Sequence, residues 1–242
     1  MSVCHIIDLG LVGYAAALDV QQRVVAARKA GAIEDVLLFC EHPHVITLGR
    51  SGKRSNLLAS ENVLRQKGVS YFETNRGGDI TYHGPGQIVG YPILNLDALR
   101  RDVHWYVRNL EEAMIRCSAA FGISARRVAG KTGVWTSDGG AEEKLAAIGV
   151  HISRWVTSHG FAYNVATDLR YFDLIVPCGI AERKATSLEK LLARSVALQE
   201  VRPVLARELA SVFGLTLQPA GTEKLFQRLQ AFEQAQAVAV PA

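Results

Sequence analysis

A glycine-rich run at Arg76 to Ile93, RGGDITYHGPGQIVGYPI, constrains the fold of this chain more than any other segment. The paired Gly77 and Gly78 allow positive φ angles or a close approach of the backbone to a ligand, and Gly84-Pro85-Gly86 marks a turn. The apolar stretch Ile88 to Leu94 that follows has the composition of a strand. The run contains neither G-x-G-x-x-G nor a G-K-[ST] ending, which excludes the usual nucleotide-binding loops. It predicts a loop that approaches an extended chain or a carbonyl group.

Cys178 lies downstream in the string IVPCGI, between a proline and a glycine. These neighbours favour a turn, which presents the thiol with little side-chain bulk around it. Together with the glycine-rich run, such a thiol indicates an acyl-transferring enzyme. The alternative is that Cys178, like most free cysteines, fills a core. Cys40 and Cys117 are expected to be core residues, and with Cys4 they lack any C-x-x-C spacing, so neither a zinc site nor a disulfide framework is expected.

Hydrophobic periodicity predicts helices and strands that alternate along the chain. Helices closed by glycines are expected at Tyr14–Lys29, Ser60–Lys67 and Asp102–Phe121. Strands are expected at Val3–Leu9, Val36–Cys40, Val45–Leu48, Val69–Glu73 and Gly133–Thr136. Two longer strands, Lys144–Ile152 and Trp155–Val165, are expected to form a hairpin around Ser153-Arg154. This order predicts an α+β fold with a mixed, largely antiparallel central sheet flanked by helices.

The composition predicts one globular domain. The chain has 242 residues, of which 49% are hydrophobic and 21% charged, enough to bury a core. No repeat, linker or block of like charge marks a boundary, so a single domain is expected at residues 1–220. A net charge of +4 without a dense basic stripe argues against nucleic-acid binding. Without a signal-peptide pattern or an apolar stretch of about 20 residues, we expect a cytoplasmic protein that uses no membrane.

Three segments resemble the octanoyltransferases of lipoate biosynthesis, the lipoyl(octanoyl) transferase family. They are the glycine-rich run, the segment EKLAAIGVHISRWVTSHGFAYNV at Glu143–Val165, and IVPCGI with the trailing Thr186-Ser187. The segments occur in the order of the family, and the resemblance extends to about Phe213. It implies the catalytic-domain fold of biotin and lipoate protein ligases, in which the substrate lies across a central sheet.

The resemblance also implies the chemistry. Family members transfer an octanoyl group from acyl carrier protein to a lysine of a lipoyl domain, with a cysteine and a lysine as the catalytic pair. By position these are Cys178, the acyl-thioester nucleophile, and Lys144, in the pattern K-x-A-x-x-G. Lys144 on its own would be interpreted as a solvated charge, and Lys131 in AGKTGVW is a nearby rival that does not fit the pattern. A neighbouring ammonium lowers the pKa of a thiol, and the same lysine then serves as general acid and base.

The same resemblance implies a substrate site built from the glycine-rich loop and the two long strands. The substrate-binding residues that it assigns are Arg76, Gly77, Gly78, Asp79, Ile80, Thr81, Tyr82, His83, Ala147, Ile148, Gly149, Gly160, Phe161 and Ala162. For His83, a hydrogen bond that braces the loop is an equal alternative to ligand contact. His42 and His44 have no acidic or thiol partner at metal-ligand spacing and are expected to be turn residues.

The implied partners are octanoyl-acyl carrier protein as donor, and lipoyl domains of 2-oxoacid dehydrogenase acyltransferase subunits and glycine cleavage H protein as acceptors. No cofactor, metal, nucleic acid or membrane is expected, and a monomer is expected. Arg100-Arg101 and Arg126-Arg127 are candidates for docking the acidic carrier. Two other function classes stay open. An ATP-dependent lipoate or biotin ligase needs no cysteine at position 178, and a non-catalytic carrier-binding module leaves both Lys144 and Cys178 unexplained.

Two features depart from the family pattern. Asp79 occupies a loop position where the family often has a neutral polar residue, which predicts an extra negative charge near the mouth of the site. Residues 221–242 extend past the shared region. Within them Leu225, Phe226, Leu229 and Phe232 have helical spacing, so we expect a docked helix followed by a frayed tail.

Overall fold

The structure is a computed structural model that describes residues 2–137, 141–176 and 184–239. Within these residues, the largest sheet has eight strands in the order β11-β1-β2-β6-β10-β9-β8-β7. The strands are β1 Ser2–Leu11, β2 Asp35–Glu41, β6 Gln87–Ile93, β7 Arg126–Val128, β8 Lys131–Thr136, β9 Glu143–Ser153, β10 Val156–Asn164 and β11 Leu215–Pro219. β1 pairs in parallel with β2 and β11, whereas the other neighbours pair antiparallel. The predicted α+β fold with a mixed, largely antiparallel sheet is confirmed.

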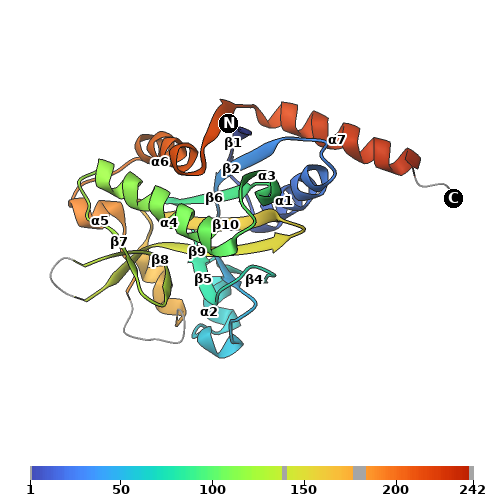
Figure 1. Cartoon of the computed structure of the whole chain (residues 1–242). Helices are drawn as coiled ribbons and strands as arrows, with labels where there is room; N and C mark the ends of the chain where they lie inside the picture. Colours follow the sequence, from blue (N-terminus) through green and yellow to red (C-terminus); the bar gives the residue numbers. More distant parts are fainter. Residues whose placement is uncertain (1, 138–140, 177–183, 240–242) are drawn as a thin grey trace.

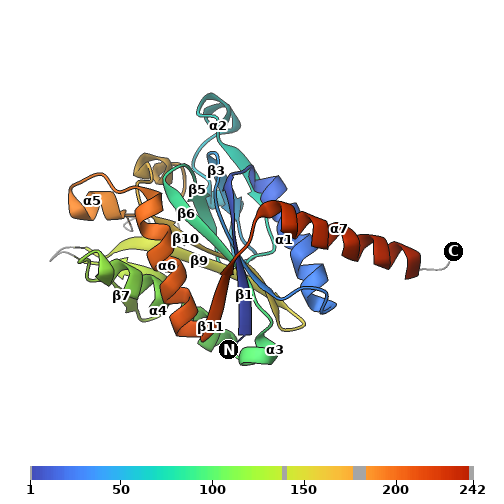
Figure 2. The ribbon, with the colours of Figure 1, turned by 90° about the horizontal axis from the view of Figure 1, so that it is seen from above.

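Helices cover both faces of this sheet (Figures 1 and 2). On one face lie α4 Val103–Ala120 and α6 Leu198–Phe213, which bury side chains such as Leu110 and Leu205 completely. On the other lie α1 Tyr14–Lys29 and α7 Thr222–Ala239. Short helices α3 Leu96–Leu99 and α5 Leu188–Leu192 lie in the connections. Each helix buries one apolar face against the sheet, as a two-sided α+β arrangement requires.

Local sequence signals set the ends of the two best-predicted helices. α1 has the predicted bounds, and α4 begins after Asp102, whose carboxylate accepts a hydrogen bond from the N–H of Trp105 at 2.9 Å. Beyond the end of α4, Gly122 has φ +76°, the left-handed conformation that glycine adopts most readily.

The predicted hairpin is formed by β9 and β10, with its turn one residue later than expected. Arg154 and Trp155 both have positive φ angles, +50° and +58°, and Ser153 pairs with Val156. Two successive left-handed residues are typical of a type I′ turn, whose twist matches that of the strands. Arg154 and Trp155 adopt this turn although neither has the backbone freedom of glycine, so local propensity does not predict it.

A smaller three-stranded sheet packs beside the large one, in the order β4-β3-β5 (Figure 1). Its strands are β3 Val45–Leu48, β4 Ser70–Glu73 and β5 Ile80–His83, and α2 Glu61–Gln66 with the 3₁₀ turns η1 Arg54–Asn56 and η2 Leu169–Leu174 surround it. The expectation of a loop throughout Arg76–His83 is therefore wrong for β5. The reason is tertiary: Ile80 and Tyr82 are buried in the apolar core of this sheet, and β5 pairs with β3.

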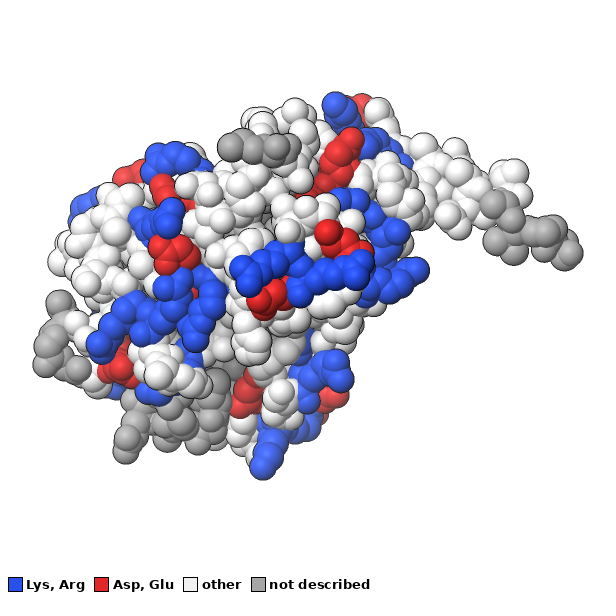
Figure 3. Space-filling view, viewed as in Figure 1, with Lys and Arg blue, Asp and Glu red and all other residues white. Residues whose placement is uncertain are grey.

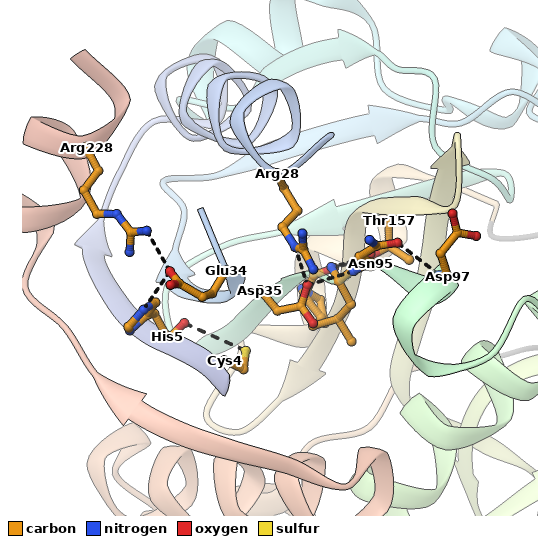
Figure 4. Close-up of polar contacts among 11 residues, drawn as sticks. Cys4, His5, Arg28, Glu34, Asp35, Asn95, Asp97, Thr157 and Arg228 are labelled. Carbon is orange, nitrogen blue, oxygen red and sulfur yellow. Dashed lines mark hydrogen bonds and ion pairs between the residues drawn. The ribbon is translucent and has the colours of Figure 1, made fainter. Parts of the chain in front are cut away.

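A buried carboxylate ties several elements to the first strands (Figure 4). Asp35, only 1% exposed, accepts hydrogen bonds from Nε of Arg28 at the end of α1 (2.7 Å) and from the N–H of Asn95 before α3 (2.8 Å). Burial raises the pKa of Asp35. Beside it, Glu34 forms an ion pair with Arg228 of α7 at 2.7 Å. These contacts fix α1, α3 and α7 at one end of the sheet.

α7 packs against α1 and β1 over the part from its start to Glu233. Leu225 and Leu229 are buried there, and Arg23 of α1 pairs with Glu233 at 2.6 Å. Phe226 remains 37% exposed beneath the Arg23 guanidinium. The C-terminal end of α7 extends away from the body (Figures 1 and 2), and residues 240–242 of the expected frayed tail lie outside the described residues. No helix in the described part of the chain is long and apolar enough to cross a membrane.

Candidate active site

A cavity of about 450 Å³ lies against β6, β9 and β10 and is bordered by β5 and the loop before it. In the β9–β10 pair, Ala147 lies opposite Ala162 and Gly149 lies opposite Gly160. Because side chains alternate along strands, these four small residues lie on the same face of the sheet. Ala147 and Ala162 add little side-chain volume to this wall of the cavity, whereas neighbouring backbone lies close to Gly149 and Gly160.

Two of the glycines are required by the close approach of neighbouring backbone. A Cβ atom at Gly160 would overlap the carbonyl oxygen of Gly90 on β6. At Gly149 a Cβ would lie 2.8 Å from the carbonyl oxygen of Gly77, closer than real Cβ atoms come to other atoms. The glycine-rich loop therefore lies directly on β9, and a larger residue would displace this loop at Gly149 and the neighbouring strand β6 at Gly160.

Arg76 fixes the glycine-rich loop to the smaller sheet. Its side chain is 7% exposed, and Nη2 donates to the carbonyl and hydroxyl oxygens of Thr47 at 2.7 and 2.9 Å. Nη1 donates to the carbonyl of Gly77 at 3.0 Å, and the N–H of Gly77 donates to Val150 of β9 at 2.9 Å. The guanidinium thus binds its own chain while forming part of the cavity wall.

Most residues assigned to the substrate site by the resemblance line this cavity. From the loop and β5 they are Arg76, Gly78, Asp79, Ile80, Thr81 and His83, and from the hairpin they are Ala147, Ile148, Gly149, Gly160, Phe161 and Ala162. Of the described loop residues, Gly77 and Tyr82 are not part of the lining. Tyr82 is buried behind it, where its hydroxyl bonds to Nδ1 of His44 at 2.7 Å. The carboxylate of Asp79, at the cavity, accepts a hydrogen bond from Nδ2 of Asn56 at 2.7 Å.

A chain of buried hydrogen bonds crosses the wall of the cavity. Nε2 of Gln87 donates to Oδ1 of Asn164 at 2.9 Å, so the Gln87 side-chain oxygen faces Nδ1 of His83 at 2.8 Å. Nδ2 of Asn164 in turn donates to the carbonyl of Thr186 at 2.9 Å. Sequence reasoning missed Gln87 and Asn164, since their mutual contact spans 77 positions of sequence. The chain connects the glycine-rich motif to the segment that follows Cys178.

Lys144 lies at the start of β9 and lines the cavity. Its Nζ is 4.6 Å from the centre of the Trp135 ring, whose face attracts a cation. Its backbone is held on both sides, because its N–H donates to the carbonyl of Lys184 and its own carbonyl accepts from the N–H of Thr186, each at 2.9 Å. The catalytic candidate is therefore positioned by the segment 184–186.

Lys131, the rival lysine, also lines the cavity. Its Nζ forms an ion pair with Glu142 at 2.7 Å and lies 5.5 Å from the same Trp135 ring. Position alone therefore does not separate Lys131 from Lys144. Glu142 binds Arg126 as well, at 3.3 Å, so Lys131 belongs to a charged cluster at the edge of the cavity.

Cys178 lies outside the described residues. Among its described neighbours in sequence, Val176 donates its N–H to the carbonyl of Asn56 at 2.7 Å, and Lys184 lines the cavity. The other three cysteines are buried, which confirms the prediction that Cys40 and Cys117 are core residues. Burial raises the pKa of the Cys4 and Cys40 thiols, and that of Cys117 to about 12. These three thiols are therefore poor nucleophiles at neutral pH.

Buried histidines surround the inner part of the cavity. Burial, with His42 and Arg76 nearby, lowers the pKa of His83 to about 3, and burial with Arg76 lowers that of His159 to about 4. His42 follows a strand in a turn region, as expected, but its ring is fully buried and bonds to Val12 O and Tyr91 OH, both at 2.7 Å. Nothing in its H-x-H context signals that role. No group of three or more His, Cys, Asp and Glu in the described ranges is arranged to hold a metal ion.

Comparison with known proteins gives the class of this fold and site. Residues 13–210 match the family described as the lipoyl protein ligase A/B catalytic domain, and the chain belongs to that family. A lipoate protein ligase from Thermoplasma acidophilum, solved as part of an archaeal lipoylation system, has the same fold. Its TM-score is 0.75 at 19% identity, covering 96% of this chain and 92% of the other.

Closer relatives give the particular enzyme type. The octanoyltransferase of Acidobacterium capsulatum is 54% identical over 223 residues, which cover 88% of this chain and 91% of that protein. That of Solibacter usitatus is 51% identical over 222 residues, covering 92% and 98%. Within its family the chain is therefore an octanoyltransferase, an acyltransferase of lipoate metabolism.

Proposed function

We propose that the chain transfers an octanoyl group from octanoyl-acyl carrier protein to one lysine of a lipoyl domain, through a thioester on Cys178. One observation carries the proposal: Lys144, the lining of the cavity and the segment following Cys178 meet through direct hydrogen bonds. Lys184 lines the cavity six positions after Cys178 in the sequence, which supports a short reach from the thiol to Lys144.

In the first step, the Cys178 thiolate attacks the carbonyl carbon of the donor thioester. The new C–S bond forms on Cys178, the bond to the carrier sulfur breaks, and that sulfur leaves as a thiol after taking a proton. The ammonium of Lys144 stabilises the thiolate before attack and supplies the proton to the leaving sulfur. Lys144 is then a neutral amine.

In the second step, the amine of the acceptor lysine attacks the acyl-Cys178 carbonyl. An amide forms, the C–S bond to Cys178 breaks, and the proton lost by the attacking amine returns to Lys144. The first step exchanges one thioester for another, and the second converts a thioester to a more stable amide. No ATP is needed, which separates this reaction from that of an ATP-dependent ligase with the same fold.

The octanoyl chain would lie on the four small residues of β9 and β10. Ala147 and Ala162 leave room above the sheet, Gly149 and Gly160 border it, and Val89 of β6 adds an apolar side chain beside them. Burying the chain there is favourable by about 0.8 kcal/mol for each methylene. The carbonyl end would then point to Lys144, one of the cations in the lining.

The surface beside the cavity suits an acidic carrier protein. Basic side chains gather over α4, β7 and β8 in Figure 3, with acidic ones among them. They are Arg108, Arg116, Arg126, Arg127 and Lys131, five cations against the three anions Glu111, Glu112 and Glu142. Arg126-Arg127 belongs to this group, in which cations outnumber anions, whereas Arg100 and Arg101 are each balanced by one aspartate, so Arg126-Arg127 is the better candidate. Raising ionic strength should weaken donor binding through this surface.

The acceptors in this proposal are lipoyl domains of 2-oxoacid dehydrogenase acyltransferase subunits and of glycine cleavage H protein. We also propose that the chain acts in the cytoplasm, because a nucleophilic thiol requires a reducing compartment. We further propose that it acts as a monomer. We also propose that residues 1–220 form the catalytic domain and that 221–242 are an extension.

The test is transfer to a lipoyl domain from octanoyl-carrier protein, with and without ATP, followed by intact-mass and peptide-mass measurement. We expect a mass increase of one octanoyl group on Cys178 before the acceptor is added, and transfer without ATP. Activity only with free octanoate plus ATP would assign the chain to the ligase class, and an adduct on another residue would overturn the mechanism.

A further inference from the structure

Lys144 has a long side chain, and its neighbours on β8 determine where the ammonium lies. In the antiparallel pair of β8 and β9, Trp135 lies opposite Lys144. Gly133 borders the middle of the lysine side chain, because a Cβ atom there would lie 3.5 Å from Cε of Lys144. Beyond that point, Nζ lies 4.6 Å from the centre of the Trp135 ring. A glycine and an indole of one strand thus border the path of the lysine side chain.

The Trp135 ring is itself fixed in orientation. Trp135 is 1% exposed, and its Nε1 donates to the carbonyl of Lys131 at 3.3 Å. Two residues before it, the N–H of Gly133 donates at 3.0 Å to Oε1 of Glu111, a buried carboxylate of α4 that also pairs with Arg127. The strand therefore presents the face of the ring rigidly, whereas a lysine side chain on its own has many rotamers.

The ring acts on the charge of the lysine as well as on its position. The face of an indole carries partial negative charge and attracts an ammonium, more strongly where water is excluded. A neutral amine gains much less, so the ring favours the charged form of Lys144. Lys131 lies farther from the ring centre, at 5.5 Å, and its charge is balanced by Glu142 at 2.7 Å. The ring therefore distinguishes between two lysines that line the same cavity.

We propose that Trp135 is a positioning residue for Lys144, which holds the ammonium at one place in the cavity and stabilises its charged form. The inference rests on the proposed function, in which the ammonium of Lys144 stabilises the thiolate of Cys178 during the first step. Weakening the attraction of the ring lets Lys144 lose its proton at lower pH. The first step should then decline at a lower pH than in the wild type.

The test measures the ionisation of Lys144 directly, by its labelling with an amine-reactive reagent over a range of pH, followed by peptide mass measurement. Replacing tryptophan with a highly fluorinated analogue during expression weakens the negative face of the ring with little change in its shape. Half-maximal labelling of Lys144 should then move to lower pH by about 0.4 to 1.5 pH units. The midpoint for Lys131 should move less.

Fluorinated Trp135→Phe is the matched control. The chain has three tryptophans, and the other two, Trp105 and Trp155, lie outside the cavity lining. In the Trp135→Phe background, fluorination should therefore leave the Lys144 midpoint where it is with ordinary tryptophan. Fluorinated wild-type protein keeps every side chain, so the test does not depend on whether Trp135→Phe folds stably.

The other charged groups around Lys144 are the same with ordinary and with fluorinated tryptophan. They come from several elements and are Arg76, Asp79, Arg126, Lys131, Glu142, Glu143, Lys184 and Lys190. Fluorination changes none of these charges, so a difference between the two midpoints reports the effect of the ring.

The pH dependence of kcat/KM with octanoyl-carrier protein is a second readout. Its upper pH limit should move by the same amount, whereas a purely structural effect would lower the rate without moving the limit. The proposal is overturned by an unshifted Lys144 midpoint, by an equal shift in fluorinated Trp135→Phe, or by a larger shift at Lys131. Because labelling needs no acyl transfer, the expected shift in a protein that transfers nothing would contradict the proposed function alone.

Discussion

The carbonyl oxygen of Lys144 accepts a hydrogen bond from the backbone N–H of Thr186 at 2.9 Å. The bond is one half of a parallel bridge, in which Lys144 pairs with Ala185 and donates its own N–H to Lys184. The strand that carries the proposed base is thereby joined to the segment that follows the proposed nucleophile. Two motifs that lie far apart in the sequence are therefore joined by backbone hydrogen bonds. These bonds fix the backbone of Lys144, so that only its side chain can still move.

Lys144→Arg should separate the two proposed steps. Arginine keeps a cation near the Trp135 ring, so a thiolate on Cys178 stays favoured and some acylation continues, although arginine cannot supply the proton to the leaving sulfur. It does not give up its proton, so it cannot act as the base, and turnover should fall about 10²-fold to 10⁴-fold. Mass spectrometry should find acyl-enzyme that accumulates without reaching the acceptor.

Lys131→Arg is the matched control, because Lys131 lines the same cavity and lies over the same ring. Arginine keeps the pair with Glu142, so this variant should retain most of its turnover. If Lys144→Arg keeps full turnover, or if Lys131→Arg loses more turnover than Lys144→Arg, the assignment of Lys144 as the base is wrong.

Asn164→Leu should lower activity through the segment 184–186. Asn164 is 4% exposed and bonds to both Gln87 and the carbonyl of Thr186, so leucine removes the connection and leaves those partners unpaired. We expect stability to fall by about 1–3 kcal/mol, measured by denaturant unfolding, and kcat/KM to fall at least about tenfold, which is about 1.4 kcal/mol of transition-state stabilisation.

Thr157→Val tests whether that loss is specific. Thr157 lies on the same strand, fully buried, and bonds to Pro92 and Leu94 outside the cavity lining. Its loss should cost similar stability and leave kcat/KM nearly unchanged below the melting temperature. If both variants lose activity equally, the effect follows from general destabilisation and the positioning role of Asn164 is refuted.

Much of the fold could be predicted from local sequence, because its signals are local. The N-cap of Asp102, the glycine after α4 and the periodicity of Tyr14–Lys29 act over one or two turns of chain. The strand at Ile80–His83 could not be predicted in the same way, since glycines surround it and its pairing with β3 is tertiary. For the same reason the sequence does not predict the burial of His42, because its partners Val12 and Tyr91 come from distant segments.

The residues of the candidate site likewise fall into two groups, those that the sequence motifs identify and those that only the tertiary structure brings to the cavity. Motif resemblance selected hairpin and loop residues that do line the cavity. It did not select Tyr14, Trp135, Gln87 or Asn164, which enter the wall through folding. A lone tyrosine at the start of a helix has the pattern of a core residue, and only the folded structure places Tyr14 in the wall of the cavity.

Acid should destabilise the protein through its buried histidines. The pKa of His83 is lowered to about 3 and that of His159 to about 4 in the folded state, below the ordinary value of 6.5. A lowered folded-state pKa means that the unfolded chain binds protons first, so this stability is present above pH 6.5 and is lost as pH falls towards 4 and 3. Unfolding free energy should fall by roughly 2–4 kcal/mol between pH 7 and pH 5.

His159→Asn should reduce this dependence. Asparagine tolerates the positive φ of +55° at this position and does not titrate. The slope of unfolding free energy against pH should become shallower in His159→Asn, while His104→Gln, at an exposed histidine, should keep the wild-type slope. An unchanged slope in His159→Asn would mean that another group causes the acid sensitivity.

The C-terminal helix should support stability and not chemistry. Leu229 of α7 is fully buried against α1 and the sheet, so Leu229→Ala should cost about 2–5 kcal/mol. Val238→Ala, at a residue 87% exposed, should change stability by less than about 0.5 kcal/mol.

Truncation after Gly221 should lower the melting temperature more than it lowers turnover, because no described residue of α7 lines the cavity. Circular dichroism melts and transfer assays at low temperature would measure both effects. A truncated protein that stays folded yet loses transfer activity would make α7 part of the site and end the assignment of residues 221–242 as an extension.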